Sequence, residues 1–447
     1  MSSQSFGMKN YMKGALLLTI AAIVVKVLSA VYRVPYQNMV GDQGFYVYQQ
    51  VYPFISFFVV WTSSGFAVAI SKMLADLDGT GRSAQSRKQA VSHIIFGYLT
   101  VLSLLFFGGL FFGAKHLAAL MWDPMLAPLL QVGAFVALCM PLHAMLKGTF
   151  QSRGMMQPVA YAQVFEQTIR VVIILVGITV VMATTKSVYS AGKMALFGTA
   201  VGEVAGVLLL LWYMRKKTNL GQVEKIRLPI WPVIKEVTIF SVAISMSGLL
   251  LLCFQLVDSF TVYSMLVQAG MPELEAMTLK GVYDRGQPLV QLGIVIASSL
   301  SLAIVPLVAF KSKNLNGRGA NPFIQLTYRA SLIFGFAAAL GLMLVMPYVN
   351  TMLFKTDALS SVLILYVLQI VPLSIILTFT AILQGYSKLL VPTLILVGAI
   401  VMKCIGNILF IDSAGLMGVA VASNAALFSA CLLYTSDAAD ERSSVDL

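Results

Sequence analysis

Of the 447 residues, 59% are hydrophobic and 11% are charged, whereas about a quarter of the residues in a soluble domain are charged. A water-soluble fold is therefore excluded, because its surface must be largely polar or mixed and this chain has too few polar residues to cover it. The formal net charge of +12 does not indicate a nucleic-acid partner, because the lysines and arginines lie mostly in short segments between apolar runs.

The chain contains about twelve apolar runs of the length, roughly 20 residues, that a membrane-spanning helix needs. Six lie in the first half, at residues 13–35, 45–70, 90–112, 128–146, 158–181 and 193–213. Six follow in the second half, at residues 233–260, 287–310, 326–346, 360–383, 390–410 and 416–433. The first run is too long for the apolar part of a signal peptide, and no small-residue cleavage site follows it, so we interpret it as the first membrane helix.

Basic residues are distributed unevenly between the loops that join these runs. The loops on one side carry many of them, including Lys72, Arg87, Lys147, Arg153, Arg215, Lys311 and Lys388. The loops on the opposite side carry only a few, such as Lys115, Lys186 and Lys355. Because basic loops remain in the cytoplasm, we expect a multi-pass protein with a cytoplasmic amino terminus.

The two halves resemble each other weakly. Gly44-Phe45-Tyr46 opens the second run and Gly281-Val282-Tyr283 opens the eighth, while Arg170 lies inside the fifth run and Lys403 inside the eleventh. This spacing predicts a duplicated six-helix unit whose copies are parallel repeats. The expected fold is all-α, with two six-helix lobes at residues 1–214 and 233–430, a basic cytoplasmic linker at 215–232, and a central cavity between the lobes.

The last stretch, residues 431–447, resembles a translated sequencing-library adapter more than a natural sequence. The apolar twelfth run breaks off abruptly into it. We therefore set this stretch apart from the fold and expect the natural chain to continue differently. A genuine polar tail is the alternative.

No motif for catalysis, a cofactor or a metal is evident. The cysteines show neither a CxxC motif nor a Cys/His ligand spacing, so no zinc site and no disulfide framework is expected; they are Cys139, Cys253, Cys404 and Cys431. A phosphate-binding loop of the Walker type is also missing from the sequence, so we expect no direct use of ATP.

Ionisable residues inside the apolar runs are the main functional signal, because such residues are costly in a membrane and usually face a cavity or a partner. Lys26 and Arg33 are seven residues apart and therefore lie on one helix face. Glu166 and Arg170 form either an intrahelical ion pair or part of a ligand site. Arg33 and Arg285 either face a cavity or extend to the outer membrane interface.

Most of these deep charges are positive, which favours an anionic substrate, since Arg binds phosphate with paired hydrogen bonds and Lys supplies a point charge. The candidate substrate-binding residues are Lys26, Arg33, Arg170, Arg285, Gln287, Gln291 and Lys403. The candidate ion-coupling residues are Asp42, Glu166 and Asp258.

Three segments carry a family resemblance: Gly41-Asp42-Gln43-Gly44-Phe45-Tyr46, Phe254-Gln255-Leu256-Val257-Asp258-Ser259, and the stretch from Gly281 to Gln291. They resemble polysaccharide biosynthesis proteins, in particular the stage V sporulation protein B and lipid II flippase branch of the multidrug/oligosaccharidyl-lipid/polysaccharide exporter superfamily. Many members have fourteen helices, so we expect a C-terminal pair to be missing here.

The resemblance implies a transporter of the bacterial inner membrane that works by alternating access without ATP. The implied substrate is an undecaprenyl-diphosphate-linked sugar, such as lipid II or another polysaccharide precursor for the cell wall, and cell-wall synthases are the implied partners. The family's basic residue in the first helix corresponds to Lys26 or Arg33, and its basic residue in the eighth corresponds to Arg285.

Two alternative functions belong to other classes. A multidrug/cation antiporter of the same fold needs an acidic, aromatic cavity, which the cationic bias disfavours. A glycan polymerase or ligase would be an enzyme and needs large outer loops with catalytic groups. The longest expected outer loop, residues 263–280, is short and contains only Glu273 and Glu275 as acids, so we expect no enzyme.

Overall fold

The computed structural model describes residues 2–77, 82–215, 226, 228–299, 321–386 and 390–445, and these ranges contain helices and no strands. Helices are expected in lipid, because a membrane offers no water to satisfy backbone N–H and C=O groups. The first lobe comprises α1 (Ser2–Val31), α2 (Arg33–Val60), the π-helix η1 (Trp61–Phe66), α3 (Ala67–Asp76), α4 (Arg82–Leu120), the short 3-10 helix η2 (Pro124–Leu126), α5 (Ala127–Ser152), α6 (Met156–Thr184) and α7 (Val188–Arg215).

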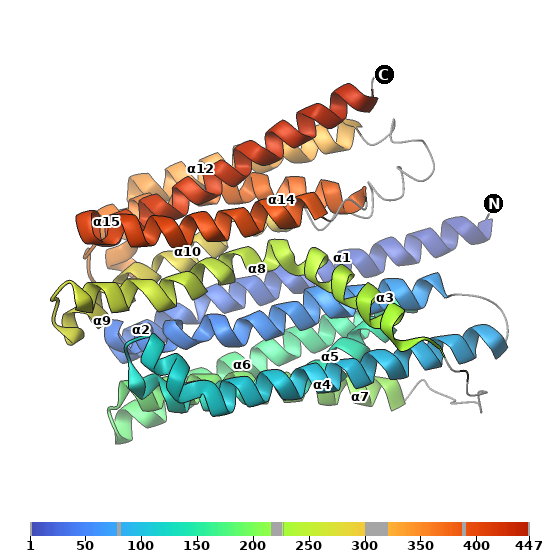
Figure 1. Cartoon of the computed structure of the whole chain (residues 1–447), viewed down its shortest axis with the longest axis horizontal. Helices are drawn as coiled ribbons and strands as arrows, with labels where there is room; N and C mark the ends of the chain where they lie inside the picture. Colours follow the sequence, from blue (N-terminus) through green and yellow to red (C-terminus); the bar gives the residue numbers. More distant parts are fainter. Residues whose placement is uncertain are drawn as a thin grey trace.

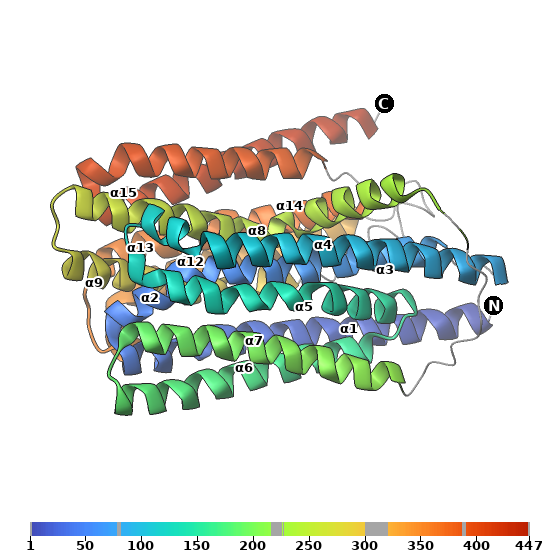
Figure 2. The same ribbon diagram turned by 60° about the horizontal axis from the view of Figure 1, so that its bottom comes forward.

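The second lobe comprises α8 (Ile230–Gln268), α9 (Glu273–Asp284), α10 (Gly286–Gly293), α12 (Asn321–Phe354), α13 (Ser360–Val367), α14 (Ile370–Gly385) and α15 (Leu390–Val445). The hairpin of α6 and α7 lies at one side of the bundle and α15 at the opposite side (Figures 1 and 2). The start of α1 and the end of α15 lie at the same end of the bundle (Figure 1), as an even number of crossings requires.

The expectation of about twelve crossings in two lobes is confirmed. Within the described residues, nine segments are long and apolar enough to cross a membrane. Two of them, Leu16–Asp76 and Val391–Tyr434, are long enough to cross twice and turn back at Gly41 and Gly415, which have φ values of 70° and 52° (Figure 1). Glycine tolerates this left-handed region because it has no Cβ. The expected eighth crossing, residues 287–310, lies partly outside the described residues.

The observed helices differ from the predicted runs mainly at their ends. The interval 263–280, which was expected to be an outer loop, is mostly helical, because α8 continues to Gln268 and α9 begins at Glu273. The expected tenth helix is divided into α13 and α14 around Leu368 and Gln369. Pro372 has no N–H to bond the carbonyl of Leu368, which explains this interruption.

The predicted boundaries between the lobes and at the tail remain predictions. Helix α7 ends at Arg215 and α8 begins at Ile230, while most of the basic linker between them lies outside the described residues. Helix α15 continues through the adapter-like stretch to Val445. Within it Tyr434 is buried, and its hydroxyl is 3.1 Å from both the Thr380 hydroxyl and the Pro392 carbonyl oxygen.

The interior and the outer surface have the distribution expected of a protein dissolved in lipid. Large apolar side chains face outward, with Phe112 at 79% and Leu344 at 80% exposure. The core extends through both lobes and contains several tyrosines, such as Tyr36, Tyr46 and Tyr283, that are completely buried. Their position inside is consistent with an outer surface that contacts acyl chains rather than water.

The lobes meet along α8, which packs against α2, η1, α3 and α4, and along α9, which packs against α2. Small residues permit the close approach, as is usual between membrane helices. A methyl group at Gly65 of η1 would lie 2.8 Å from the Ser241 carbonyl oxygen of α8. A methyl group at Gly281 of α9 would overlap the Asp42 carbonyl oxygen.

The contact at Gly281 predicts a local packing defect. Gly281→Ala should lower the thermal stability of the purified protein in detergent by about 1–3 kcal/mol, because the backbone of α2 must move to admit the methyl group. The control is Gly341→Ala in α12, where the added methyl group has open space. Equal melting temperatures for the two variants would contradict this account of the interface.

Candidate functional site

Arg33 lies where the lobes meet and is completely buried. Its Nη1 atom donates to the amide oxygens of Gln287 at 3.0 Å and Gln291 at 3.4 Å, both from the second lobe. The guanidinium lies 4.4 Å from the centre of the Tyr52 ring, a cation–π contact. Its other two nitrogens, Nε and Nη2, are buried without a hydrogen-bond partner.

Lys26 extends from the first lobe to the same part of the second. Its ammonium donates to the Ser298 hydroxyl at 2.7 Å, seven residues after Gln291. Gln49 of α2 also donates to the Gln287 amide oxygen. The structure therefore brings together three of the predicted substrate-binding residues, Arg33, Gln287 and Gln291, while Lys26 contacts the second lobe further along, at Ser298.

Arg285 is separate from this group, because its guanidinium is occupied by other partners. Its Nε donates to an Asp42 carboxylate oxygen at 3.0 Å, and its Nη1 donates to the Asn350 amide oxygen at 3.0 Å. Asp42, a predicted ion-coupling residue, thus forms an ion pair across the lobes. Gln43 and Thr278 lie 3.3 Å apart across the same boundary. These contacts join the lobes at the end of the bundle that carries α9.

Lys403 and Asp258, predicted for different roles, form a buried ion pair in the second lobe at 2.8 Å. The Lys403 ammonium also donates to the Ser423 hydroxyl at 2.6 Å, and Asn407 donates to the same Asp258 oxygen at 2.8 Å. Lys403 is fully buried, so its charge is compensated within the lobe.

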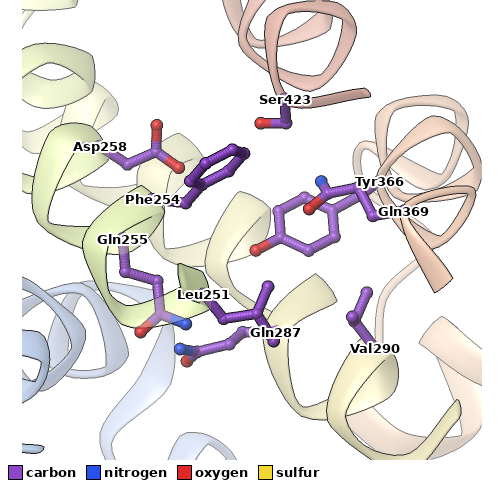
Figure 3. A pocket seen from close by; sticks show the side chains of 9 residues that line it. All are labelled: Leu251, Phe254, Gln255, Asp258, Gln287, Val290, Tyr366, Gln369 and Ser423. Carbon is purple, nitrogen blue, oxygen red and sulfur yellow. The ribbon is translucent and has the colours of Figure 1, made fainter. Parts of the chain in front are cut away.

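A small cavity lies beside this pair, on the second-lobe side of the interface. Its walls come from α8, α10, α13 and α15, with Gln369 before α14, and its lining residues are Leu251, Phe254, Gln255, Asp258, Gln287, Val290, Tyr366, Gln369 and Ser423 (Figure 3). The volume open to the centre of a water molecule is about 10 Å³, which is room for about one water. Amide atoms of Gln255, Gln287 and Gln369 have no hydrogen-bond partner, so the wall presents unused polar groups.

A second group of charges lies inside the first lobe, and we name it the N-lobe cluster: His143, Lys147, Glu166, Arg170 and Glu203. Arg170 Nη2 lies 3.1 Å from Glu166 and 2.8 Å from Glu203. The predicted Glu166–Arg170 ion pair is therefore present, but Arg170 is directed at two carboxylates. Lys147 was placed in a cytoplasmic loop, and this was wrong, since it is a buried residue of α5 with its ammonium 3.7 Å from Glu166.

Sequence reasoning missed His143, Lys147 and Glu203 as members of a site. One signal was present in the sequence: Glu203 is an acid within the apolar run 193–213, and His143 and Lys147 are one helical turn apart, so both point to one side of α5. Nothing in the sequence paired these residues across three helices.

The deep cations fall into two groups, those that have a carboxylate partner and those that have none. Within the described residues, five deep cations have a carboxylate partner: Arg170 with Glu166 and Glu203, Lys147 with Glu166, Lys280 with Asp284, Arg285 with Asp42, and Lys403 with Asp258. In the same part of the chain, Lys26 and Arg33 contact only neutral side chains and have no carboxylate within ion-pair distance. Among the described residues, the two deep cations without an ion-pair partner therefore both lie at the interface between the lobes.

A two-lobe bundle of about twelve apolar helices with buried charges at the lobe interface is the architecture of a multi-pass membrane transporter. Residues 11–310 match the polysaccharide biosynthesis protein family, and the chain belongs to this family.

Two relatives from Bacillus subtilis (strain 168) match almost the whole chain. The membrane protein YabM is 36% identical over 432 residues, which cover 95% of this chain and 80% of YabM. The lipid II flippase MurJ is 24% identical over 447 residues, which cover 95% of this chain and 81% of MurJ.

Solved structures share the fold at low sequence identity. A lipid II flippase MurJ in an inward closed conformation has a TM-score of 0.68 at 15% identity, with 95% of this chain and 87% of that chain covered. A MATE protein in a bent conformation has a TM-score of 0.67 at 15% identity, with 98% and 96% covered.

The Lys403–Asp258 pair gives a test of charge compensation. Asp258→Asn should destabilise the protein by about 3–5 kcal/mol, because it leaves a buried ammonium without a counter-charge. Adding Lys403→Met should recover most of this loss, since replacing both charges removes the unpaired one. Thermal unfolding in detergent measures both effects, and a double variant as unstable as Asp258→Asn alone would contradict the assignment.

Proposed function

We propose that the protein is a flippase that moves an undecaprenyl-diphosphate-linked sugar, lipid II or a related polysaccharide precursor, from the inner to the outer leaflet of the bacterial cell membrane. The observation that carries the proposal is the uncompensated charge of Lys26 and Arg33 between the lobes. Arg33 is fully buried and Lys26 is partly buried, and a cation at membrane depth without a carboxylate is costly. A diphosphate that enters the interface would supply the missing negative charge.

The chemistry of Arg33 suits a phosphate. Its Nε and Nη2 atoms are buried and unpartnered, and a guanidinium binds phosphate through paired N–H donors. Lys26, on the same helix face as Arg33, adds a point charge. The unused amide groups of Gln255, Gln287 and Gln369 are suited to sugar hydroxyls, which both donate and accept hydrogen bonds.

The two lobes would have to separate for such a substrate to enter, since the cavity now holds about one water. The contacts at the α9 end, including Asp42–Arg285, close that end, which faces outward if the amino terminus is cytoplasmic. Substrate would enter from the cytoplasmic side. Opening of the outer end would then free Arg285 from Asp42, and Arg285 would become a further phosphate ligand.

The antiporter of the same fold is a weaker candidate, because a cationic substrate would meet the unpaired charges of Lys26 and Arg33. An enzyme is also disfavoured. The outer interval between α8 and α9 is short and offers no large catalytic domain. Transport of an anionic lipid head group therefore fits the described residues better than either alternative.

The proposal predicts the effect of neutralising each unpaired cation. Arg33→Gln and Lys26→Gln should each slow the flipping of fluorescent lipid II in proteoliposomes about tenfold or more, because a hydrogen bond to a charged group contributes about 1.5–3 kcal/mol. Arg33→Lys should retain part of the activity. The control is Lys115→Gln, which removes an exposed charge of α4. Folded Arg33→Gln and Lys26→Gln variants with the activity of the control would contradict the proposal.

The proposed orientation is tested by thiol labelling of intact cells. In a cysteine-free background, Lys186→Cys and Lys355→Cys should react with a membrane-impermeant maleimide. Lys186 is exposed between α6 and α7, and Lys355 is exposed directly after α12; these helix ends lie at the α9 end of the bundle (Figure 1). Arg153→Cys, exposed at the opposite end, should react only after the cells are opened. The reverse pattern would place the amino terminus outside.

A further inference from the structure

One hydrogen-bond position in the N-lobe cluster is unfilled. His143 Nδ1 lies 2.7 Å from Glu203 Oε2, and His143 Nε2 lies 3.4 Å from Glu166 Oε2. A neutral imidazole donates from only one nitrogen, and the shorter contact places that proton on Nδ1. His143 Nε2 and Glu166 Oε2 are then two acceptors that face each other, and both are buried without a hydrogen-bond partner.

One proton would satisfy both atoms. With His143 neutral, the carboxylates of Glu166 and Glu203 balance the cations Arg170 and Lys147. An added proton therefore gives the cluster one net positive charge. The five side chains have 12% exposure or less, so water screens this charge little and it acts on Arg170 and Lys147. The other titratable groups near the cluster are Cys139 on α5 and Tyr32 and Tyr48, which interact electrostatically with Arg170.

A proton fits this position better than a metal ion. The donor atoms of His143, Glu166 and Glu203 lie within 4.8 Å of one another. Arg170 already pairs with both carboxylates, however, at 3.1 and 2.8 Å, and a divalent ion would have to displace it. The site is also tight, because a methyl group at Gly206 of α7 would lie only 3.1 Å from Glu166 Oε2.

The cluster is connected to the lobe interface through Lys147. Its ammonium lies 3.7 Å from Glu166 Oε2 and donates to the Ser63 hydroxyl at 3.1 Å. Ser63 belongs to η1, a π-helix, and such segments are frequent at functional sites. Gly65 of the same segment packs closely against Ser241 of α8 in the second lobe. A change of charge on Glu166 therefore acts on an ammonium that contacts η1 directly.

We propose that the N-lobe cluster is a proton-binding site, in which one proton taken up between His143 Nε2 and Glu166 Oε2 weakens the hold of Glu166 on Lys147 and so alters the contact of η1 with α8. Proton binding and release would then accompany opposite stages of the lobe movement. The role in transport rests on the proposed function, whereas the binding of the proton stands without it.

Trp61 provides a reporter for this movement. It lies in η1, two residues before Ser63, and its ring contacts Phe57, Phe66 and Phe106. The chain has four tryptophans. Replacing Trp122, Trp212 and Trp231 by Phe leaves Trp61 as the source of the fluorescence, and its emission can be followed against pH in lipid nanodiscs with no lipid-linked sugar.

The reporter protein should show a pH-dependent transition in Trp61 emission. Glu166→Gln should remove the transition and hold the low-pH signal at every pH, because its amide N–H can donate to His143 Nε2 as the bound proton would. His143→Gln should also remove it. The matched control is His116→Gln, since His116 is exposed on α4 and this variant should keep the transition.

A transition that persists unchanged in both Glu166→Gln and His143→Gln would overturn the proposal. A signal that follows added Zn²⁺ and disappears with a chelator, independently of pH, would also overturn it in favour of a metal site. If either variant fails to fold, infrared difference spectra of the reporter protein decide the matter. A protonated carboxyl band or an imidazolium band must appear at the pH of the Trp61 transition, and the absence of both would refute the site.

The transport role has its own readout. Flipping of lipid II in proteoliposomes should depend on a pH gradient in the wild type and lose that dependence in His143→Gln, but not in His116→Gln. A pH-dependent Trp61 signal with no flipping of lipid II or of any other undecaprenyl-diphosphate-linked sugar would leave the proton site standing and refute the proposed function. Flipping that ignores the gradient in the wild type would refute the coupling alone.

Discussion

The compensation of buried charge is the constraint on which the structure depends. A charge inside a bundle that faces lipid cannot be solvated by water, so it must meet an opposite charge or several dipoles. Each lobe compensates its own buried charge. Arg170 lies between two glutamates in the first lobe, and Lys403 pairs with Asp258 in the second. These pairs hold helices together within a lobe, and they leave each lobe suited to move as a unit.

The boundary between the lobes is built differently. Among the described residues, its contacts include close approaches at glycines, single polar hydrogen bonds, the aromatic pairs Tyr46–Tyr263 and Phe54–Phe260, and the Asp42–Arg285 ion pair. Such contacts can be broken and re-formed at lower cost than the interior of a lobe. The unpaired cations, Lys26 and Arg33, lie at this boundary, where a movement of the lobes would expose them. Apart from the Asp42–Arg285 pair, the compensated charges therefore lie inside the lobes, which would stay rigid. The uncompensated charges lie at the boundary where the lobes would separate.

Much of the fold follows from the sequence because lipid imposes a simple rule. Long apolar runs must become helices, so about twelve crossings in two lobes could be predicted, together with the turns near Gly41 and Gly415. Glu166–Arg170 was also predictable, because residues four apart on a helix are neighbours. The helix ends were less certain, since α8 and α9 extend into the expected loop at 263–280, where composition no longer separates helix from loop.

The sequence by itself determined the class of fold, the family and the depth of most charged residues, since hydropathy and local spacing are properties of a single helix. Only the tertiary structure decided which charges are partners. Asp42 and Arg285 are 243 residues apart, and Arg170 and Glu203 are 33 apart on neighbouring helices. Such pairs depend on how helices are rotated and aligned against one another, which no single helix encodes. For that reason Lys147 could be mistaken for a loop residue, and only the placement of the described carboxylates shows that none of them pairs with Arg33.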